Sequence, residues 1–401
     1  MDSGRQPGVS YRMIGLVAAV LVVLGGVAGY RALAPGAIAD RAETAYPRSA
    51  PSAQPGVYGT LLAAPIVVDG RLRVYASKQQ VYADDPVNIK STMSPFWSYR
   101  RWPAQVLGVV AVGTTVVTQW SDGELVALNA TTGAVAWQAK LTLPGGLVYT
   151  GRRTGASTVY DPSRLYSAGR TVVAAGATQV RGYDAGTGRQ LWQRPASACS
   201  NDFTGPDVFV SVTTCGQPAV HAYAAATGAP LSWPQAALTP VGCALGHSGC
   251  QGVRDSQGAW AIGTGGALTP APVLARPGVW VTGDVAVVPH GDGQVAGVGL
   301  TDNRQLWTAE GRVIAVEPGV VHLAVPVPGF RFLEVTTLDA TSGESLSGYL
   351  LKPQASQPFD LGQVYAVDRF LFIERVNPGA TPDQPDSAYY FPTPNVIVAG
   401  S

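Results

Sequence analysis

Four cysteines are the residues whose type and number most directly suggest chemistry in this chain. Cys199, Cys215, Cys243 and Cys250 form an even set, which is compatible with two disulfides in an exported protein. Three pairings exist, and proximity in the sequence favours Cys199 with Cys215 and Cys243 with Cys250. A zinc site would need cysteines at shorter spacing or nearby histidines, and His247 between Cys243 and Cys250 does not supply that pattern. We therefore expect disulfides and no metal.

The remaining reactive residue types do not form a catalytic pattern. None of the four histidines has a serine or cysteine partner at a spacing typical of nucleophilic catalysis: His221, His247, His290 and His322. The glycine-rich stretch 263–266 lacks the lysine and the strand-to-helix context of a phosphate-binding loop. The sequence predicts no catalytic residue, no cofactor-binding residue and no enzyme activity.

One short stretch combines aromatic and cationic residues. Residues 95–102 read PFWSYRRW, a mixture enriched at protein-protein hot spots and also suited to lipid headgroups. The alternative is a segment whose aromatics are core and whose arginines stack on them. The candidate interaction patch comprises Trp97, Tyr99, Arg100, Arg101 and Trp102.

A repeated phrase predicts the elements that must carry these residues. It is clearest as YDAGTGRQLW at residues 183–192, and related phrases begin near residues 128, 223, 299 and 338. In each, an apolar run leads to a turn that is rich in Asp, Asn, Thr and Gly, and in four of the five a short strand with Trp follows. The motif residues are expected to be structural: Asn129, Gly133, Trp137, Asp184, Gly188, Trp192, Gly228, Trp233, Trp307, Asp339 and Gly343.

The spacing of these phrases predicts an all-β propeller of four-stranded blades. The turn positions 133, 188, 228, 303 and 343 are separated by 55, 40, 75 and 40 residues. The long steps indicate an insertion around 152–166 and an unmarked blade near 263–266. With sheet expected at 57–120 and 361–401, the count is seven blades, or eight. Residues 395–399 are expected to seal the ring by completing a blade begun near 66–74.

An apolar segment precedes this domain. Met13–Tyr30 contains no charged residue over 18 positions, enough to cross a bilayer core of about 30 Å as a helix. Ala32-Leu33-Ala34 resembles a signal-peptide cleavage site, but Pro35 follows directly, so an uncleaved signal anchor is favoured over cleavage. We expect a cytoplasmic tail at 1–12, a transmembrane signal anchor at 13–30, a Pro/Ala-rich linker at 31–56 and the propeller at 57–401, on the extracytoplasmic side of the cell membrane.

The charge balance argues against one class of partner. Lys plus Arg is 27 and Asp plus Glu is 26, so the chain has no overall field to attract nucleic acid. Because the chain is expected to be anchored and exported, its expected partners are the membrane, through the N-terminal helix, and a protein of the cell envelope.

The five phrases resemble the blade repeat of the pyrroloquinoline-quinone-like (PQQ-like) β-propeller family, Ala-x-Asp-x-x-Thr-Gly-x-x-x-Trp, over roughly Val57–Ser401. That family includes quinoprotein dehydrogenases and propellers without a cofactor, such as the scaffold lipoprotein of the outer-membrane assembly machinery. The anchor, the linker and the 23 Arg against four Lys also resemble membrane-anchored propellers of high-GC actinobacteria.

The resemblance implies a fold more strongly than a reaction. The quinoprotein enzymes carry adjacent cysteines and a calcium-binding acidic cluster, whereas no two cysteines are adjacent here. The sequence therefore predicts a membrane-anchored, extracytoplasmic scaffold that binds protein and does not catalyse. The alternative is a small-ligand-binding or quinoprotein-like enzyme that uses the central funnel.

Overall fold

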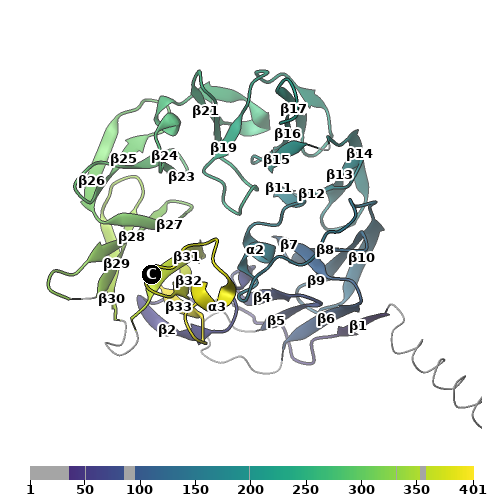
Figure 1. Cartoon of the computed structure of the whole chain (residues 1–401), viewed down its shortest axis with the longest axis horizontal. Helices are drawn as coiled ribbons and strands as arrows, with labels where there is room; N and C mark the ends of the chain where they lie inside the picture. Colours follow the sequence, from purple (N-terminus) through teal and green to yellow (C-terminus); the bar gives the residue numbers. More distant parts are fainter. Residues whose placement is uncertain (1–35, 50, 85–94, 198, 331, 353–357) are drawn as a thin grey trace, which may run out of the picture.

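Short apolar strands separated by tight turns form nearly the whole of the described chain. The computed structural model describes residues 36–49, 51–84, 95–197, 199–330, 332–352 and 358–401. Its strands form eight antiparallel sheets arranged around a common centre (Figure 1). The expected all-β propeller is confirmed, and the number of blades is eight.

The first four blades follow one another along the chain, each starting with its innermost strand. Blade 1 contains β3 (Ile66–Val68), β4 (Leu72–Ser77), β5 (Gln80–Asp84) and β6 (Trp97–Trp102), with β1 (Gly36–Asp40) added outside β6. Blade 2 contains β7 (Val106–Val112), β8 (Thr115–Trp120), β9 (Glu124–Asn129) and β10 (Val135–Lys140). Blade 3 contains β11 (Leu165–Ala168), β12 (Thr171–Ala175), β13 (Gln179–Asp184) and β14 (Gln190–Pro195). Blade 4 contains β15 (Ser200–Thr204), β16 (Val208–Thr213), β17 (Ala219–Ala224) and β18 (Pro230–Leu231).

The next three blades repeat the same order. Blade 5 contains β19 (Thr239–Val241), β20 (Gly252–Arg254), β21 (Ala259–Ile262) and β22 (Leu268–Pro270). Blade 6 contains β23 (Trp280–Thr282), β24 (Val285–Pro289), β25 (Gln294–Gly299) and β26 (Gln305–Glu310). Blade 7 contains β27 (Arg312–Glu317), β28 (Val320–Pro326), β29 (Leu333–Asp339) and β30 (Ser345–Leu351). The unmarked blade expected near 263–266 is blade 5, whose turn between β21 and β22 holds those residues.

Blade 8 closes the ring with strands from both ends of the domain. It contains β31 (Asp360–Val367), β32 (Phe370–Val376) and β33 (Val396–Gly400), and its outermost strand is β2 (Gly56–Leu61). Leu61 pairs with Val396 in this ladder. The expectation that residues 395–399 complete a blade begun at 66–74 is therefore wrong, because β3 and β4 already belong to blade 1. β2 gave little signal in the sequence, since GVYGTL contains two glycines.

Hydrophobic clusters lie between neighbouring blades. One of them joins Val117 and Trp137 of blade 2 to Val172 and Tyr183 of blade 3. Burial of apolar area between successive sheet faces is the main source of stability in such a ring.

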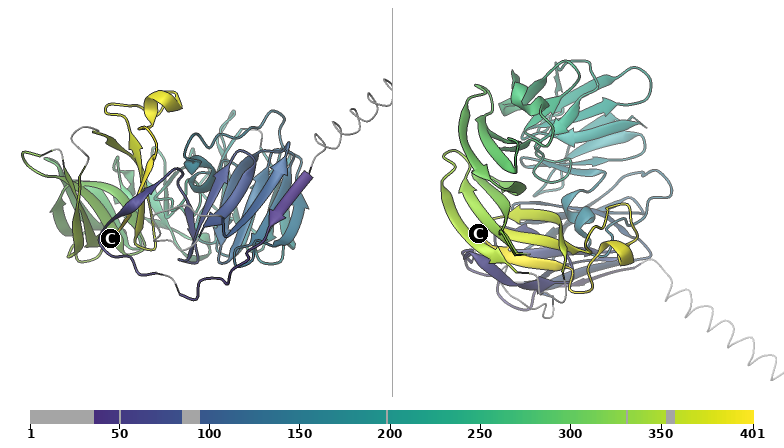
Figure 2. Two further views of the ribbon diagram at one scale, coloured as in Figure 1. Left: turned by 90° about the horizontal axis from the view of Figure 1, so that it is seen from below. Right: turned by 60° about the vertical axis from the view of Figure 1, so that its left-hand side comes forward.

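Short helices occur in the connections. α2 (Ala156–Tyr160) lies in the predicted insertion, η1 (Thr264–Gly266) and η2 (Pro272–Ala275) flank β22, and α3 (Asp386–Tyr389) lies between β32 and β33. The edge-on view shows α3 projecting from one face, while the chain that connects β1 to β2 runs along the other (Figure 2).

The N-terminal expectations are only partly within the described residues. No helix in the described part of the chain is long and apolar enough to cross a bilayer. The predicted anchor Met13–Tyr30 and the tail before it lie outside the described residues. The predicted linker at 31–56 is not wholly irregular, because β1 pairs with β6 from Gly36 opposite Trp102 to Asp40 opposite Ser98. Its short GAIAD sequence carries no alternation that would have marked it as a strand.

Candidate functional site

Repeated tryptophans join five of the eight blades to the blade that follows. In five blades an indole Nε1–H donates a hydrogen bond of 2.6–2.9 Å to a backbone carbonyl of the following blade. The pairs are Trp97 with Ala130, Trp137 with Ala185, Trp192 with Ala225, Trp233 with Gly266, and Trp307 with Ala340. We call this arrangement the tryptophan clasp.

The motif glycines receive the tryptophans of the preceding blade. Gly188 has φ of +71°, and a Cβ there would lie 2.5 Å from Cγ of Trp137. The same clash would occur at Gly133, Gly228 and Gly343. Glycine is needed at these turns both for the left-handed backbone and for the close approach of an indole.

The side chains of Asn129, Asp184 and Asp339 accept hydrogen bonds from backbone amides within the same turns. Oδ1 of Asn129 accepts a hydrogen bond from the amide of Thr131, and Oδ1 of Asp184 accepts one from the amide of Thr187. Asp339 accepts bonds from the amide and hydroxyl of Ser342. These hydrogen bonds lower the pKa of both Asp184 and Asp339. The side chains of the repeat are thus engaged within the fold.

Among the described residues no clasp is found at three junctions, between blades 5 and 6, 7 and 8, and 8 and 1, and the one between blades 7 and 8 is the junction where a repeat phrase has lost its tryptophan. Ser347 stands where Trp is expected, and its Oγ is buried without a hydrogen-bond partner among the described residues. The reason is topological. Strand β2 reaches blade 8 from the other end of the domain, so no hairpin turn joins β33 to the outermost strand. A tryptophan on β30 would have no such turn to receive it.

An apolar groove lies at this unclasped junction, which we call the seam. Its volume is about 430 Å³, and β2, β30 and blade 8 supply its lining: Val57, Thr60, Leu350, Leu351, Lys352, Phe359, Arg375 and Ile397. Val57 is 47% exposed, and Leu346 and Leu350 are each 45% exposed. Large apolar side chains at this exposure on two adjacent outer strands form a surface suited to a partner.

Two cations flank the seam groove. The Arg375 guanidinium lies 4.4 Å from the ring centre of Phe391 and 5.5 Å from that of Phe359. Burial lowers the pKa of Arg375. The Lys352 ammonium lies 5.8 Å from the ring centre of Phe332. The groove therefore combines an apolar floor with positive charge.

The predicted insertion acts as a strap across the ring closure. Arg152, which precedes α2, bonds Asp386 at 2.8 Å and the carbonyls of Pro382 and Gln384, all between β32 and β33. Thr154 donates a 2.5 Å hydrogen bond to Glu374 of β32. Burial is the main cause of the raised pKa of Glu374. Blade 8 is therefore tied to the connection between blades 2 and 3.

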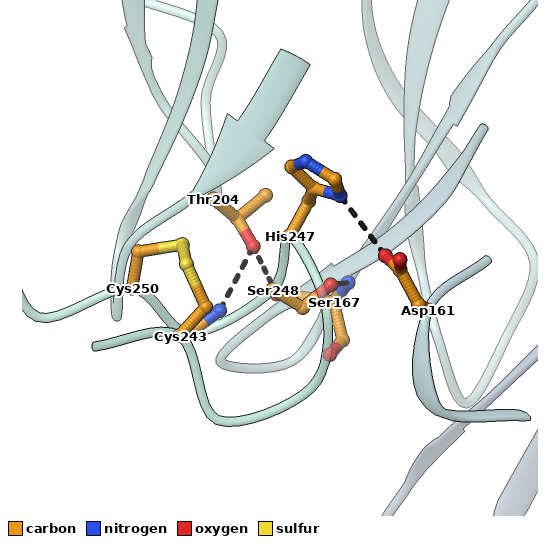
Figure 3. Close-up of a disulfide and its surroundings, with 8 residues drawn as sticks. Asp161, Ser167, Thr204, Cys243, His247, Ser248 and Cys250 are labelled. Carbon is orange, nitrogen blue, oxygen red and sulfur yellow. Dashed lines mark hydrogen bonds and ion pairs between the residues drawn. A yellow bond between two sulfur atoms is a disulfide. The ribbon is translucent and has the colours of Figure 1, made fainter. Parts of the chain in front are cut away.

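Both expected disulfides are confirmed. Cys199 pairs with Cys215 across the open end of the β15–β16 hairpin, and Cys243 pairs with Cys250 within the loop between β19 and β20. The second loop reaches other blades (Figure 3). Its His247 lies 3.0 Å from Asp161 at the end of the insertion, and the carbonyl of His247 accepts a bond from the amide of Thr204. The hydrogen bond to Asp161 raises the pKa of His247.

A second pocket lies where the inner turns of blades 1 and 8 meet. It has a volume of about 550 Å³ and is lined in part by Asp69, Asp368 and Arg369. Burial raises the pKa of Asp368, and the charges of Glu317 and Asp69 add to this effect. Within the described residues no group of three or more His, Cys, Asp or Glu is placed to hold a metal ion.

Some residues of the candidate interaction patch are buried in the structure and others are exposed. Trp97 and Tyr99 are buried, at 1% and 2% exposure, and Trp97 is one of the clasp residues. Arg101 binds both carboxylate oxygens of Asp122 and stacks over Trp120. Trp102 and Arg100 are exposed. Only part of the predicted set is therefore available at the surface, and the role of Trp97 could have been found from its distance of 40 residues to Trp137.

Two features of the site had no signal in the sequence. The strap joins residues more than 200 positions apart, and the seam depends on which strand closes the ring. Neither the arginine at 152 nor the leucines of β30 belongs to a recognisable motif.

A comparison with known protein families finds a match over more than half of this chain. The family model of the outer membrane protein assembly factor BamB matches residues 55–233 and 162–311. The chain belongs to this family. BamB of Burkholderia pseudomallei (strain K96243) is 30% identical over 181 residues, which are 43% of this chain and 44% of that protein. The match to this BamB therefore spans less than half of its length.

Solved structures also align with most of this chain. The crystal structure of BamB from Moraxella catarrhalis aligns over 88% of this chain and 99% of that chain, with a TM-score of 0.42 and 17% identity. The computationally designed protein Ika8 aligns over 87% of this chain and 98% of that chain, with a TM-score of 0.47 and 15% identity.

Proposed function

We propose that this BamB-family propeller is a protein-binding scaffold of the cell envelope that does not catalyse a reaction. In this proposal Met13–Tyr30 anchors the chain in the cell membrane as a single-pass signal anchor, and the propeller lies on the extracytoplasmic side. The family name, which describes an outer membrane assembly factor, supports a role in the envelope. The two disulfides suit an oxidising compartment.

The observation that carries the proposal is the seam. Its groove joins exposed Val57 and Leu350 to the cations Lys352 and Arg375. Among the described strands β30 pairs with β29 alone, so its outer edge is open to an added strand. We expect the partner to present an extended apolar segment with an acidic residue, because that segment would fill the groove and face the two cations.

Replacement of Leu350 tests this role. Leu350→Glu places a like charge against an acidic partner segment and removes apolar contact, so we expect at least a tenfold loss of partner recovery. The partner would be recovered from detergent-solubilised membranes and its binding to the purified protein measured. Val135→Glu is the matched control, because Val135 is an exposed valine, 38% accessible, on the outer strand of blade 2. Equal loss in both variants, or in neither, would contradict a partner site at the seam.

A second candidate function is small-ligand binding at the 550 Å³ pocket. The observation that favours it is that Asp69, Asp368 and Arg369 line one pocket where the inner turns of blades 1 and 8 meet. Native mass spectrometry of the purified protein tests it. A bound small molecule that is lost in Asp368→Asn, with no protein partner recovered, would replace the scaffold proposal. Asparagine is chosen because it tolerates the positive φ of 52° at this position.

A further inference from the structure

The rim of blade 1 lies close to the start of the domain. β1 begins at Gly36, whose partner in the ladder is Trp102. Five residues, 31–35, separate Gly36 from the last residue of the apolar segment, Tyr30. Five residues span at most about 17 Å when fully extended. If Tyr30 ends a membrane span, Trp102 is held within a short distance of the bilayer surface.

Exposed apolar side chains gather at this rim. Ile38 of β1 is 62% exposed, Trp102 is 47% exposed, and Val148, in the connection between β10 and α2, is 56% exposed. Val148 belongs to the same corner, because the amide of its neighbour Tyr149 donates a 2.9 Å bond to Gln105, three residues beyond Trp102. Tryptophan in particular favours the boundary between lipid and water.

The charged residues around Trp102 are mostly cations. Arg100 pairs with Ile38 across the ladder, and the carbonyl of Lys78 accepts a bond from Val106, at the start of the next blade. The cations of this corner are Lys78, Arg100, Arg101 and Lys140, and its carboxylates are Asp40, Asp122 and Glu124. Asp122 binds Arg101, Glu124 lies opposite Lys140, and Asp40 accepts a hydrogen bond from Ser98, so these residues leave an excess of one positive charge. Cations at such a surface are attracted to anionic lipid headgroups.

We propose that this corner of blades 1 and 2 is a membrane-contact surface, with Trp102 and Ile38 at the lipid interface and Arg100 and Lys78 facing anionic headgroups. The inference rests on the proposed anchor. It goes further, because it gives the propeller a fixed orientation in which blade 1 faces the bilayer. The short spacing to β1 favours a lipid surface over a protein at this corner, since any partner there would have to fit between the rim and the membrane.

Quenching by brominated lipid tests the contact. The full chain is reconstituted into vesicles that contain phosphatidylglycerol and phosphatidylcholine brominated near the headgroup end of the acyl chains. We expect partial quenching of tryptophan fluorescence, and Trp102→Phe should remove at least half of the quenched fraction. Trp280→Phe is the matched control, because Trp280 is 37% exposed on blade 6, and it should leave the quenched fraction unchanged. Replacing the anionic lipid with neutral lipid should reduce the quenching at least twofold.

The test separates this inference from the anchor. Resistance of the full chain to alkaline extraction reports the anchor. Extraction resistance without quenching that depends on Trp102 would overturn the membrane-contact surface and leave the anchor in place. Quenching that is lost equally in both tryptophan variants would also overturn it. So would a co-purified protein that depends on Trp102 while the quenching does not change. Extraction from the membrane together with Trp102-dependent quenching would refute the anchor and support the contact surface.

Discussion

The clasped junctions and the seam solve the same packing problem in different ways. At five junctions a tryptophan fills the space between two blades and donates to a carbonyl of the next turn. At the seam Ser347 replaces the tryptophan, and a strap from the insertion holds blade 8 instead. Every clasp in the described structure meets a receiving hairpin, but a hairpin alone does not secure a clasp, because β22 of blade 5 has no tryptophan beside the β25–β26 hairpin of blade 6.

Removing a clasp should have the largest effect on stability. Trp192→Ala deletes a buried indole and its hydrogen bond to Ala225, and we expect the free energy of unfolding to fall by about 3–5 kcal/mol. Urea denaturation followed by circular dichroism measures this. Trp280→Ala is the control, because Trp280 is partly exposed and is not a clasp residue, and it should cost much less. Equal losses would show that the clasp has no special role.

Cutting the strap should have an intermediate effect. Arg152→Ala removes the ion pair with Asp386 and two bonds to backbone carbonyls, so a loss of about 1–2 kcal/mol is expected. Arg304→Ala is a suitable control, because the Arg304 and Asp302 side chains are 73% and 58% exposed. If Arg152→Ala destabilised the protein no more than Arg304→Ala, the claim that the strap stabilises blade 8 would be refuted.

The strap should also give the stability a dependence on pH. The folded-state pKa of Glu374 is raised, mainly by burial, so the folded protein binds its proton more tightly than the unfolded chain does. Stability from this group is therefore full below the ordinary glutamate pKa and is lost as the pH rises through the folded-state pKa. Urea unfolding of wild type and Glu374→Gln at several pH values measures the contribution. We expect the wild type to lose stability relative to Glu374→Gln as the pH rises, and the opposite slope would contradict the assignment.

Restoring tryptophan at the seam should have the smallest effect. In Ser347→Trp the indole would lie on a partly exposed strand without a receiving hairpin, so we expect a change in unfolding free energy of about 0.5 kcal/mol or less. A gain comparable with the loss in Trp192→Ala would show that a clasp can form without that hairpin. Thermal unfolding of the two variants beside wild type makes the comparison.

The sequence predicted the parts of this fold that repeat. The turn at Asp184–Gly188 and the tryptophan at 192 have local signatures, so blades 3 and 4 could be placed from the chain alone. Trp97 was assigned to a surface patch because its neighbours Arg100 and Arg101 dominated the pattern. The partner of β33 was assigned to the wrong strand, because ring closure depends on a pairing between residues some 340 positions apart.

The candidate site was less predictable than the fold. The disulfides followed from the number and spacing of the cysteines. The groove of Val57, Leu350 and Arg375 did not, because its walls come from β2, β30 and β32, which meet only when the ring closes. Surfaces assembled from distant segments leave no local pattern in a single sequence.

Native-state hydrogen exchange can show whether the clasps hold most of the ring together and whether the seam is a weaker junction than the clasped ones. The amides of the outermost strands β30 and β2 are compared with those of β10, β14 and β26, which each carry a clasp tryptophan. We predict that β30 and β2 exchange at a lower opening free energy than the three clasped strands. Equal protection of all five strands, or earlier exchange of the clasped ones, would show that the tryptophan clasps do not stabilise their junctions more than the seam.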